Sequence, residues 1–316
     1  MIIIIINIFL AKYILKQKKK IKVCVCVCAK NENVYAEEFV RHYLKYGVDM
    51  IFIYDNNDIN DERFEDVLEK YIHKGFVKII DYRGILKIQM KAFNHCYQEN
   101  KHNFDYFIYF DMDEFIYLNN YKNIKEYLSQ KHFNKCNIIY LNHVIHTDNQ
   151  HIFYSNSSLV ERFPEVETIS RVNHSSIYIY VLKDIIKSIL KGNLDNIKIM
   201  NPHTLVPNIS NGCNGYGKII NQSSNIHLLT PDYKNYYFDH YYFKSSEEFL
   251  LKLTKGDVIF GSRNRLKLYR FFLYFAFNEI SEKKLNYFER ETGLDFQIFR
   301  NTSKDYLYKI KNKLLI

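Results

Sequence analysis

Three carboxylates stand within four residues in the run FDYFIYFDMDEFIYL, Phe104 to Leu118. Carboxylates this close repel one another and are costly to bring near a core. Asp111 and Asp113 follow an apolar run two residues apart, so both point to one side while Met112 points into packing. Two such carboxylates supply the hard oxygen ligands of Mg²⁺ or Mn²⁺, which also bind phosphate oxygens. We therefore predict a metal site at Asp111 and Asp113, with Glu114 orienting it. The alternative is an acidic cap that faces solvent.

The apolar pattern predicts strands and helices in alternation. Strands are expected at 21–29, 50–55, 76–81, 105–111 and 137–145, and helices near 36–47, 64–75, 86–100, 123–128, 245–253 and 266–280. Gly47 and Gly75 stand where a helix C-terminal cap belongs. Such alternation with short joints is typical of an α/β fold, a mostly parallel sheet with helices on both faces. Residues 147–237 read as loop-rich and irregular.

Polar residues follow each of the first four predicted strands. They are Asn31 and Glu32, then Asp55, Asn56 and Asn57, then Asp81 and Arg83, and finally Asp111 and Asp113. Ligands of open α/β sheets bind at the carboxyl ends of the strands. We therefore expect these four clusters to converge on one rim.

Composition bounds the class of protein. The 316 residues are 47% hydrophobic and carry a formal net charge of +9. This charge suits anionic partners, but no nucleic-acid motif has its expected spacing, so we expect no nucleic-acid partner. The six cysteines include no CxxC pair, which argues against a zinc site. Buried thiols in a reducing, cytoplasmic compartment fit these cysteines best.

The N-terminal segment 1–20, MIIIIINIFLAKYILKQKKK, is apolar and then basic. It is shorter than the roughly 20 apolar residues that span a bilayer, and its basic cluster follows the apolar run. A peripheral membrane anchor and an ordinary buried segment both remain open. The chain then divides into a catalytic domain, 21–257, with halves 21–118 and 119–257, and a helical extension, 258–316.

Several runs together resemble glycosyltransferase family 92 and related family-2-like enzymes. They are CAKNENVYAEEFVRHYLKYGVDMIFIYDNND, GILKIQMKAFNHCYQEN, DYFIYFDMDEFI, IIKSIL, NPHTL and DHYYFKSSEEFLLKLTKGD, and they cover roughly Ile21 to Asp257 in order. The resemblance implies the GT-A fold, with an irregular acceptor side and C-terminal helices. It also implies a hexosyltransferase that moves a sugar from a nucleotide diphosphate, with Mn²⁺ or Mg²⁺ as cofactor.

The resemblance implies roles for matching residues. Asp111 and Asp113 correspond to the metal-binding DxD motif, and His240 resembles a late histidine that returns to the ion or diphosphate. The implied nucleotide-sugar pocket comprises Asn31, Glu32, Asp55, Asn57, Gln89, Asn94 and Asp111, with Lys187 and Lys244 on phosphate. His143 stands where a tryptophan is expected, which puts the acceptor pocket in doubt.

The predicted reaction transfers a sugar, from a UDP-sugar, to a glycan or other hydroxyl acceptor. The resemblance implies inversion, which needs a carboxylate base. Asp148 is the first candidate for this base, with Glu161 and Asp239 as alternatives. Three other functions are considered. A nucleotidyltransferase would need a glycine-rich phosphate loop after the first strand. The other two are a metal-dependent nuclease and a non-catalytic protein that binds glycans or anions.

Overall fold

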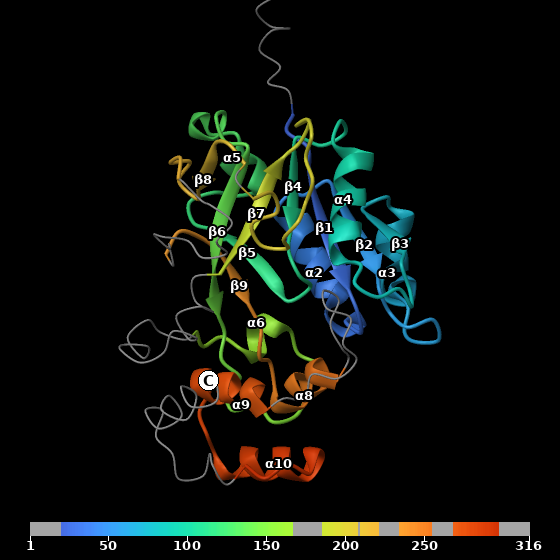
Figure 1. The fold of residues 1–316 in the computed structure, drawn as a ribbon, viewed down its shortest axis with the longest axis vertical. Coiled ribbons are helices and arrows are strands. Elements are labelled where there is room, and N and C mark those ends of the chain that lie inside the picture. The colour runs from blue at the N-terminus through green and yellow to red at the C-terminus, as the bar shows by residue number, and fades with distance from the viewer. Residues whose placement is uncertain (1–19, 167–184, 208, 221–233, 255–267, 297–316) are drawn as a thin grey trace, which may run out of the picture.

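A computed structural model describes residues 20–166, 185–207, 209–220, 234–254 and 268–296 of the chain (Figure 1). Its strands are β1 (Val23–Ala29), β2 (Met50–Asp55), β3 (Val77–Asp81), β4 (Tyr106–Tyr109), β5 (Glu114–Leu118), β6 (Ile138–Ile145), β7 (Ile186–Lys191), β8 (Gly212–Asn214) and β9 (Tyr236–His240). Its helices are α2 (Asn33–Lys45), α3 (Phe64–His73), α4 (Gln89–Asn100), α5 (Ile124–Leu128), α6 (Leu159–Arg162), α8 (Ser246–Thr254), α9 (Leu268–Phe277) and α10 (Glu282–Thr292).

Strand β1 is buried on both faces, which is why its sequence is apolar throughout. Val23, Val25 and Val27 face a core built with α2, α3 and α5. The alternate residues Cys24, Cys26 and Cys28 face a second core built with α4. The sheet therefore carries helices on both faces, as predicted.

The strands of the described residues join into one sheet of order β3-β2-β1-β4-β7-β6-β9-β5, with β8 beside β6. The pairs from β3 to β4 are parallel, as the alternating pattern predicted. Strand β7 inserts antiparallel between β4 and β6, and β9 returns antiparallel to β5. Strands β7 and β8 and the start of β9 thus lie in the region 147–237, which the sequence predicted to be irregular.

The predicted helix ends agree with the structure. Gly47 and Gly75 have φ values of +83° and +72°, the left-handed conformation that glycine adopts without strain. Helices α8, α9 and α10 gather at one end of the molecule (Figure 1) around a third, aromatic core. The division of the chain into domains stays a prediction.

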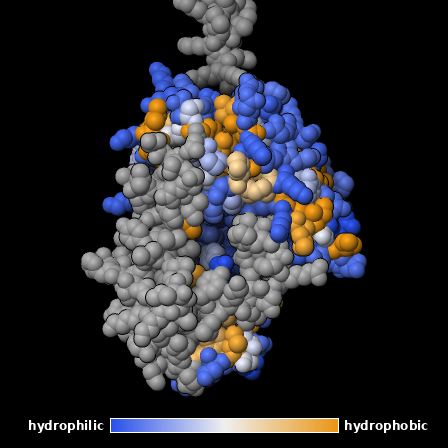
Figure 2. Space-filling view, viewed as in Figure 1, coloured by the Kyte–Doolittle hydropathy of each residue, from blue (hydrophilic) through white to orange (hydrophobic). Residues whose placement is uncertain are grey.

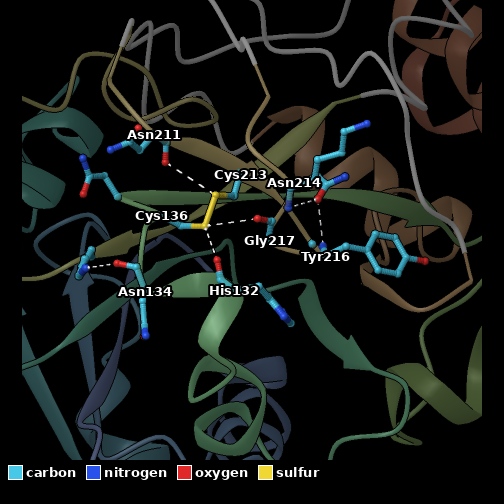
Figure 3. The surroundings of a disulfide bond; sticks show 12 residues. His132, Asn134, Cys136, Asn211, Cys213, Asn214, Tyr216 and Gly217 are labelled. Atoms are coloured by element: carbon cyan, nitrogen blue, oxygen red, sulfur yellow. Dashed lines mark hydrogen bonds between the residues drawn. A yellow bond between two sulfur atoms is a disulfide. The ribbon is translucent and has the colours of Figure 1, made fainter.

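Two of the six cysteines differ from the expected buried thiols. Cys136 and Cys213 form a disulfide that joins the chain before β6 to β8 (Figure 3), while Cys24, Cys26, Cys28 and Cys96 are free and buried. Disulfides persist mainly in oxidising compartments. The cysteines therefore no longer support the cytoplasmic location that they suggested.

The membrane expectation concerns residues 1–20, nearly all of which lie outside the described residues. Among the helices that are described, none has the length and apolar character needed to cross a bilayer. A peripheral contact through the N-terminal segment stays a prediction.

Candidate active site

The acidic run forms a tight turn between β4 and β5. The Glu114 backbone N–H donates to the Asp111 carbonyl at 3.1 Å. In return, the Asp111 backbone N–H donates to Glu114 Oε2 at 2.8 Å. Met112 is fully buried in the core, as its alternation with the aspartates predicted. The third carboxylate thus closes the turn that presents the two aspartates.

One buried lysine lies between two acidic side chains of this turn. Lys187 of β7 places Nζ 2.5 Å from Asp111 Oδ2 and 3.0 Å from Glu114 Oε2. Burial opposes its charge, but the two carboxylates raise the pKa of Lys187 above its ordinary value. Burial raises the pKa of Glu114 to about 8; Lys187 opposes this rise, and Asp111 and Asp113 add to it. Lys187 is therefore a fixed positive charge beside the turn.

Two further lysines reach Asp113 from the chain after β9. Lys244 and Lys252 each place Nζ 2.9 Å from Asp113 Oδ2. Burial would raise the pKa of Asp113, but these ammonium groups and His240 hold it well below its ordinary range. The lysines thus offset the charges of Asp111 and Asp113, and the raised pKa of Glu114 favours its neutral form, so the repulsion expected from the sequence is reduced.

Two histidines meet beside the same aspartate. His240 ends β9 opposite Glu114. Its Nε2 lies 3.6 Å from Asp113 Oδ1, and its Nδ1 lies 3.0 Å from His143 Nδ1. Burial holds the pKa of His240 well below its ordinary value, against the opposing charge of Asp113. The two Nδ1 atoms share one hydrogen bond, and Nε2 of His240 lies on the side of Asp113.

The expected metal ligands do not form a preassembled cage. Within the described ranges, no group of three or more His, Cys, Asp or Glu side chains is arranged to hold an ion. The donor chemistry nevertheless fits a divalent cation, because Asp113 Oδ1 and His240 Nε2 are close together and the lysines hold the other oxygen of Asp113. Mg²⁺ at nucleotide sites usually takes one or two carboxylates, substrate phosphates and waters.

A cleft of about 1270 Å³ opens at the ends of the first strands, against α8. Figure 2 shows a hollow with a hydrophilic floor near the middle of one face. The cleft is lined by residues that include Asn31, Glu32, Asn56, Lys244 and Lys252. One wall therefore carries the strand-end polar residues and another carries the two lysines of Asp113.

The strand-end clusters converge as predicted. In the parallel register Ala29 pairs with Asp55 and Asp55 pairs with Asp81, so these strands end at one edge of the sheet. The Asn31 backbone N–H donates to Asn57 Oδ1 at 2.6 Å. The sequence rule for strand ends thus located the rim correctly.

Two predicted pocket residues are used inside the protein. Asp55 is 1% exposed, accepts from the Asn57 backbone N–H at 2.9 Å and lies 3.7 Å from Arg83 Nε. Asn57 is fully buried and donates to the Glu62 carbonyl at 2.8 Å. Both residues shape the loop beside the cleft, which argues against direct contact with the nucleotide.

The two predicted residues of α4 separate. Gln89 donates through Nε2 to Asp111 Oδ1 at 3.2 Å, so it joins the acidic turn. Its buried Oε1 has no hydrogen-bond partner. Asn94 instead exchanges hydrogen bonds with the backbone of Ile199 at 2.7 and 2.8 Å. Asn94 ties α4 to a loop, and we do not retain it as a ligand residue.

Asp148, the first candidate for the catalytic base, is buried and held by hydrogen bonds and an ion pair. Its carboxylate is 1% exposed, and Oδ2 lies 2.6 Å from Lys284 Nζ and accepts from the Tyr274 hydroxyl. Oδ1 accepts from the Gln150 backbone N–H at 3.0 Å. This network fastens α9 and α10 to the loop after β6. Because both oxygens are engaged in a closed interior, we correct the assignment of Asp148 to a structural role.

The alternative base candidates are engaged as well. Glu161 accepts from the Ser158 backbone N–H at 3.4 Å in the capping box of α6. Asp239 Oδ1 lies 2.8 Å from His146 Nε2. Neither contact points to the acidic turn.

Helix α8 is fastened by a buried ion pair. Arg162 of α6 places its two terminal nitrogens 2.7 and 3.0 Å from the carboxylate oxygens of Glu248. The Tyr35 hydroxyl of α2 also donates to Glu248, at 2.5 Å. This joint holds the helix that carries Lys252, so it positions that lysine at Asp113.

Sequence reasoning missed Lys252 and the contact of His143 with His240. Lys252 follows Lys244 by eight residues across the start of a helix, and lysines are common in this chain. Only the eight-residue spacing could have singled out Lys252, and it is a weak signal.

The profile of glycosyltransferase family 92 matches residues 19–259 of the chain. The chain therefore belongs to glycosyltransferase family 92. It is a glycosyltransferase, and its sheet with helices on both faces is of the GT-A type that the resemblance implied. No curated protein matches the chain.

Similar solved structures are distant. S. aureus TarS 1–349 in complex with UDP-GlcNAc is 14% identical, with 93% of this chain and 72% of that one covered and a TM-score of 0.38. Mannosyltransferase PcManGT from Pyrobaculum calidifontis, in complex with GDP-Man and Mn²⁺, is 11% identical with a TM-score of 0.29. In that comparison 43% of this chain and 41% of PcManGT are covered. The family assignment rests on the profile match.

Proposed function

We propose that this glycosyltransferase moves a sugar from a UDP-sugar to a hydroxyl of a glycan or similar acceptor, with inversion and with Mn²⁺ or Mg²⁺ bound. The observation that carries the proposal is the acidic turn, where Lys187 pairs with Asp111 and the two lysines paired with Asp113 line a large cleft. The choice of UDP and the inversion follow the family resemblance.

The charges of the site support a diphosphate with one orientation. Lys244 and Lys252 line the cleft and attract phosphate oxygens. Asn31 and Glu32 line the same cleft and offer hydrogen-bonding groups for a nucleoside. We therefore propose that the diphosphate binds at the lysines and the nucleoside at the strand ends. Lys187 then adds a buried positive charge beside Asp111.

Asp113 Oδ1, His240 Nε2 and Asp111 are the proposed metal ligands. When bound, a divalent ion neutralises the diphosphate and stabilises the charge that develops on it as the sugar leaves. The residues of the chain have separate tasks. Glu114 fixes the turn, and the lysines supply further positive charge to the leaving group. Asp148 takes no part in the reaction, and we assign no base.

A nucleotide-release assay over a panel of sugar nucleotides, with and without Mn²⁺, tests the proposal. Asp113→Asn keeps the shape of the side chain and removes its charge, so we expect turnover to fall by at least about 100-fold, as when a group that stabilises developing charge is lost. Asp195→Asn, an exposed aspartate after β7, is the matched control and should leave turnover unchanged. Equal turnover in the two variants would remove Asp113 from the mechanism.

A further inference from the structure

Asp113 lies behind two ammonium groups. Its side chain is only 4% exposed. Both lysines that touch its Oδ2 line the cleft, and Lys252 is the more accessible of the two, with 26% of its side chain exposed. A ligand that enters the cleft therefore meets Lys244 and Lys252 before it meets the carboxylate.

Because the two ammonium groups lie beside the carboxylate, a metal ion that binds without a nucleotide meets electrostatic repulsion. A divalent cation at Asp113 would share one carboxylate with two ammonium groups, and the like charges repel one another. A diphosphate that binds alone meets the opposite difficulty, because the lysines that should attract it are already paired with Asp113. The carboxylate that would bind the cation and the ammonium groups that would bind the diphosphate are therefore paired with each other until both ligands are present.

We propose that Lys244 and Lys252 exchange Asp113 for the diphosphate, so that metal and nucleotide bind strongly only together. In the ternary complex the cation takes Asp113 and the two ammonium groups take phosphate oxygens. This inference rests on the proposed function and adds to it the role of Lys252. The Lys252 side chain can reach a phosphate in the cleft because Lys252 lies in the last turn of α8 and lines the cleft.

Lys252 has further contacts beside the aspartate. Its Nζ lies 3.1 Å from the Tyr242 carbonyl oxygen and 4.0 Å from the centre of the Tyr242 ring. These contacts stabilise the ammonium group independently of Asp113. Lys252 therefore has stabilising contacts that do not depend on its pairing with Asp113.

Linkage makes the exchange measurable. If UDP strengthens Mn²⁺ binding by some factor, Mn²⁺ strengthens UDP binding by the same factor. We expect this factor to be at least about tenfold, within the roughly 5- to 150-fold range of coupled sites. Titration calorimetry with Mn²⁺ alone, UDP alone, and each in the presence of the other gives the factor without any turnover.

The variant that tests the inference is Lys252→Met, which keeps the aliphatic stem and removes the charge. Mn²⁺ alone should then bind several-fold more tightly than in the wild type, while the coupling factor falls to about threefold or less. Lys283→Met makes the same charge change on the exposed face of α10 and should retain the wild-type values. Lys252→Arg keeps a positive charge and should keep the coupling, which serves as a second test if the methionine variant does not fold.

The outcomes separate the two proposals. Wild-type protein that binds Mn²⁺ equally well with and without UDP would overturn the exchange and leave the proposed function standing. A coupling factor that Lys252→Met leaves unchanged would also overturn the exchange. Wild-type protein that binds neither Mn²⁺ nor UDP would refute the proposed function, and the exchange with it.

Discussion

Replacing Arg162 with methionine tests whether the joint of α8 is as strong as its geometry indicates. The side chains of Arg162 and Glu248 are 3% and 4% exposed. Arg162→Met removes the charge and leaves Glu248 as a buried, unpaired carboxylate. We expect the free energy of unfolding at pH 7 to fall by about 3–5 kcal/mol, the usual cost of breaking a buried pair.

The pKa of Glu248 gives the same magnitude by another route. Burial would raise it, but hydrogen bonds from Arg162, Ser245 and Tyr35 lower it from 4.5 to about 2. Each pKa unit corresponds to about 1.4 kcal/mol, so the net lowering corresponds to about 3 kcal/mol of stability at neutral pH. Because the folded pKa is depressed, this stability is present above about pH 4.5 and is lost as the pH falls towards 2.

Urea unfolding followed by far-ultraviolet circular dichroism measures the effect. Arg290→Met is the control, since Arg290 pairs with Glu291 on the surface and its side chain is 66% exposed. We expect this control to cost less than about 1 kcal/mol. Adding Glu248→Gln to Arg162→Met should restore part of the loss, because no buried charge then remains. A loss for Arg162→Met no larger than that of the control would refute the reasoning.

Two further predictions concern stability. Burial lowers the pKa of His42 from 6.5 to about 4, against its hydrogen bond to the Ile116 carbonyl. Stability should therefore fall by at most about 3 kcal/mol as the pH drops from 6.5 to 4, and urea titrations of His42→Gln should lack this slope. A Cβ at Gly192 would lie 2.0 Å from the Phe104 carbonyl oxygen. Gly192→Ala should lower the free energy of unfolding by about 3 kcal/mol, against about 1 kcal/mol for Gly75→Ala, where a Cβ meets nothing within 4 Å; equal losses would contradict the clash.

The first half of the fold was predictable because its signals are local. The helix ends at Gly47 and Gly75 follow from the freedom of glycine to adopt positive φ. The rule for strand ends then predicted that Asn31, Asp55 and Asp81 lie along one edge of the sheet, as the strand register and the contact of Asn31 with Asn57 bear out. Strand β7 was missed, since a strand that crosses a sheet antiparallel leaves no alternating pattern of strand and helix around it.

The candidate site was predictable only in part. The spacing of Asp111 and Asp113 and the strand before them indicate a metal site, which stays a prediction. The prediction that Asp148 is the base was wrong, because the sequence around an aspartate that follows a strand does not indicate whether it faces a cleft or a buried lysine. Which of these surroundings it has depends on α10, more than 100 residues later.

The sequence by itself determined where the helices end, which apolar residues form the core, and that an acidic turn follows β4. These features depend on neighbours a few positions away. Only the tertiary structure decided that Lys187, Lys244 and Lys252 balance the turn, because β7 and α8 bring them from far along the chain. Ion pairing depends on distance in space, and a lysine in a lysine-rich sequence carries no mark of its partner.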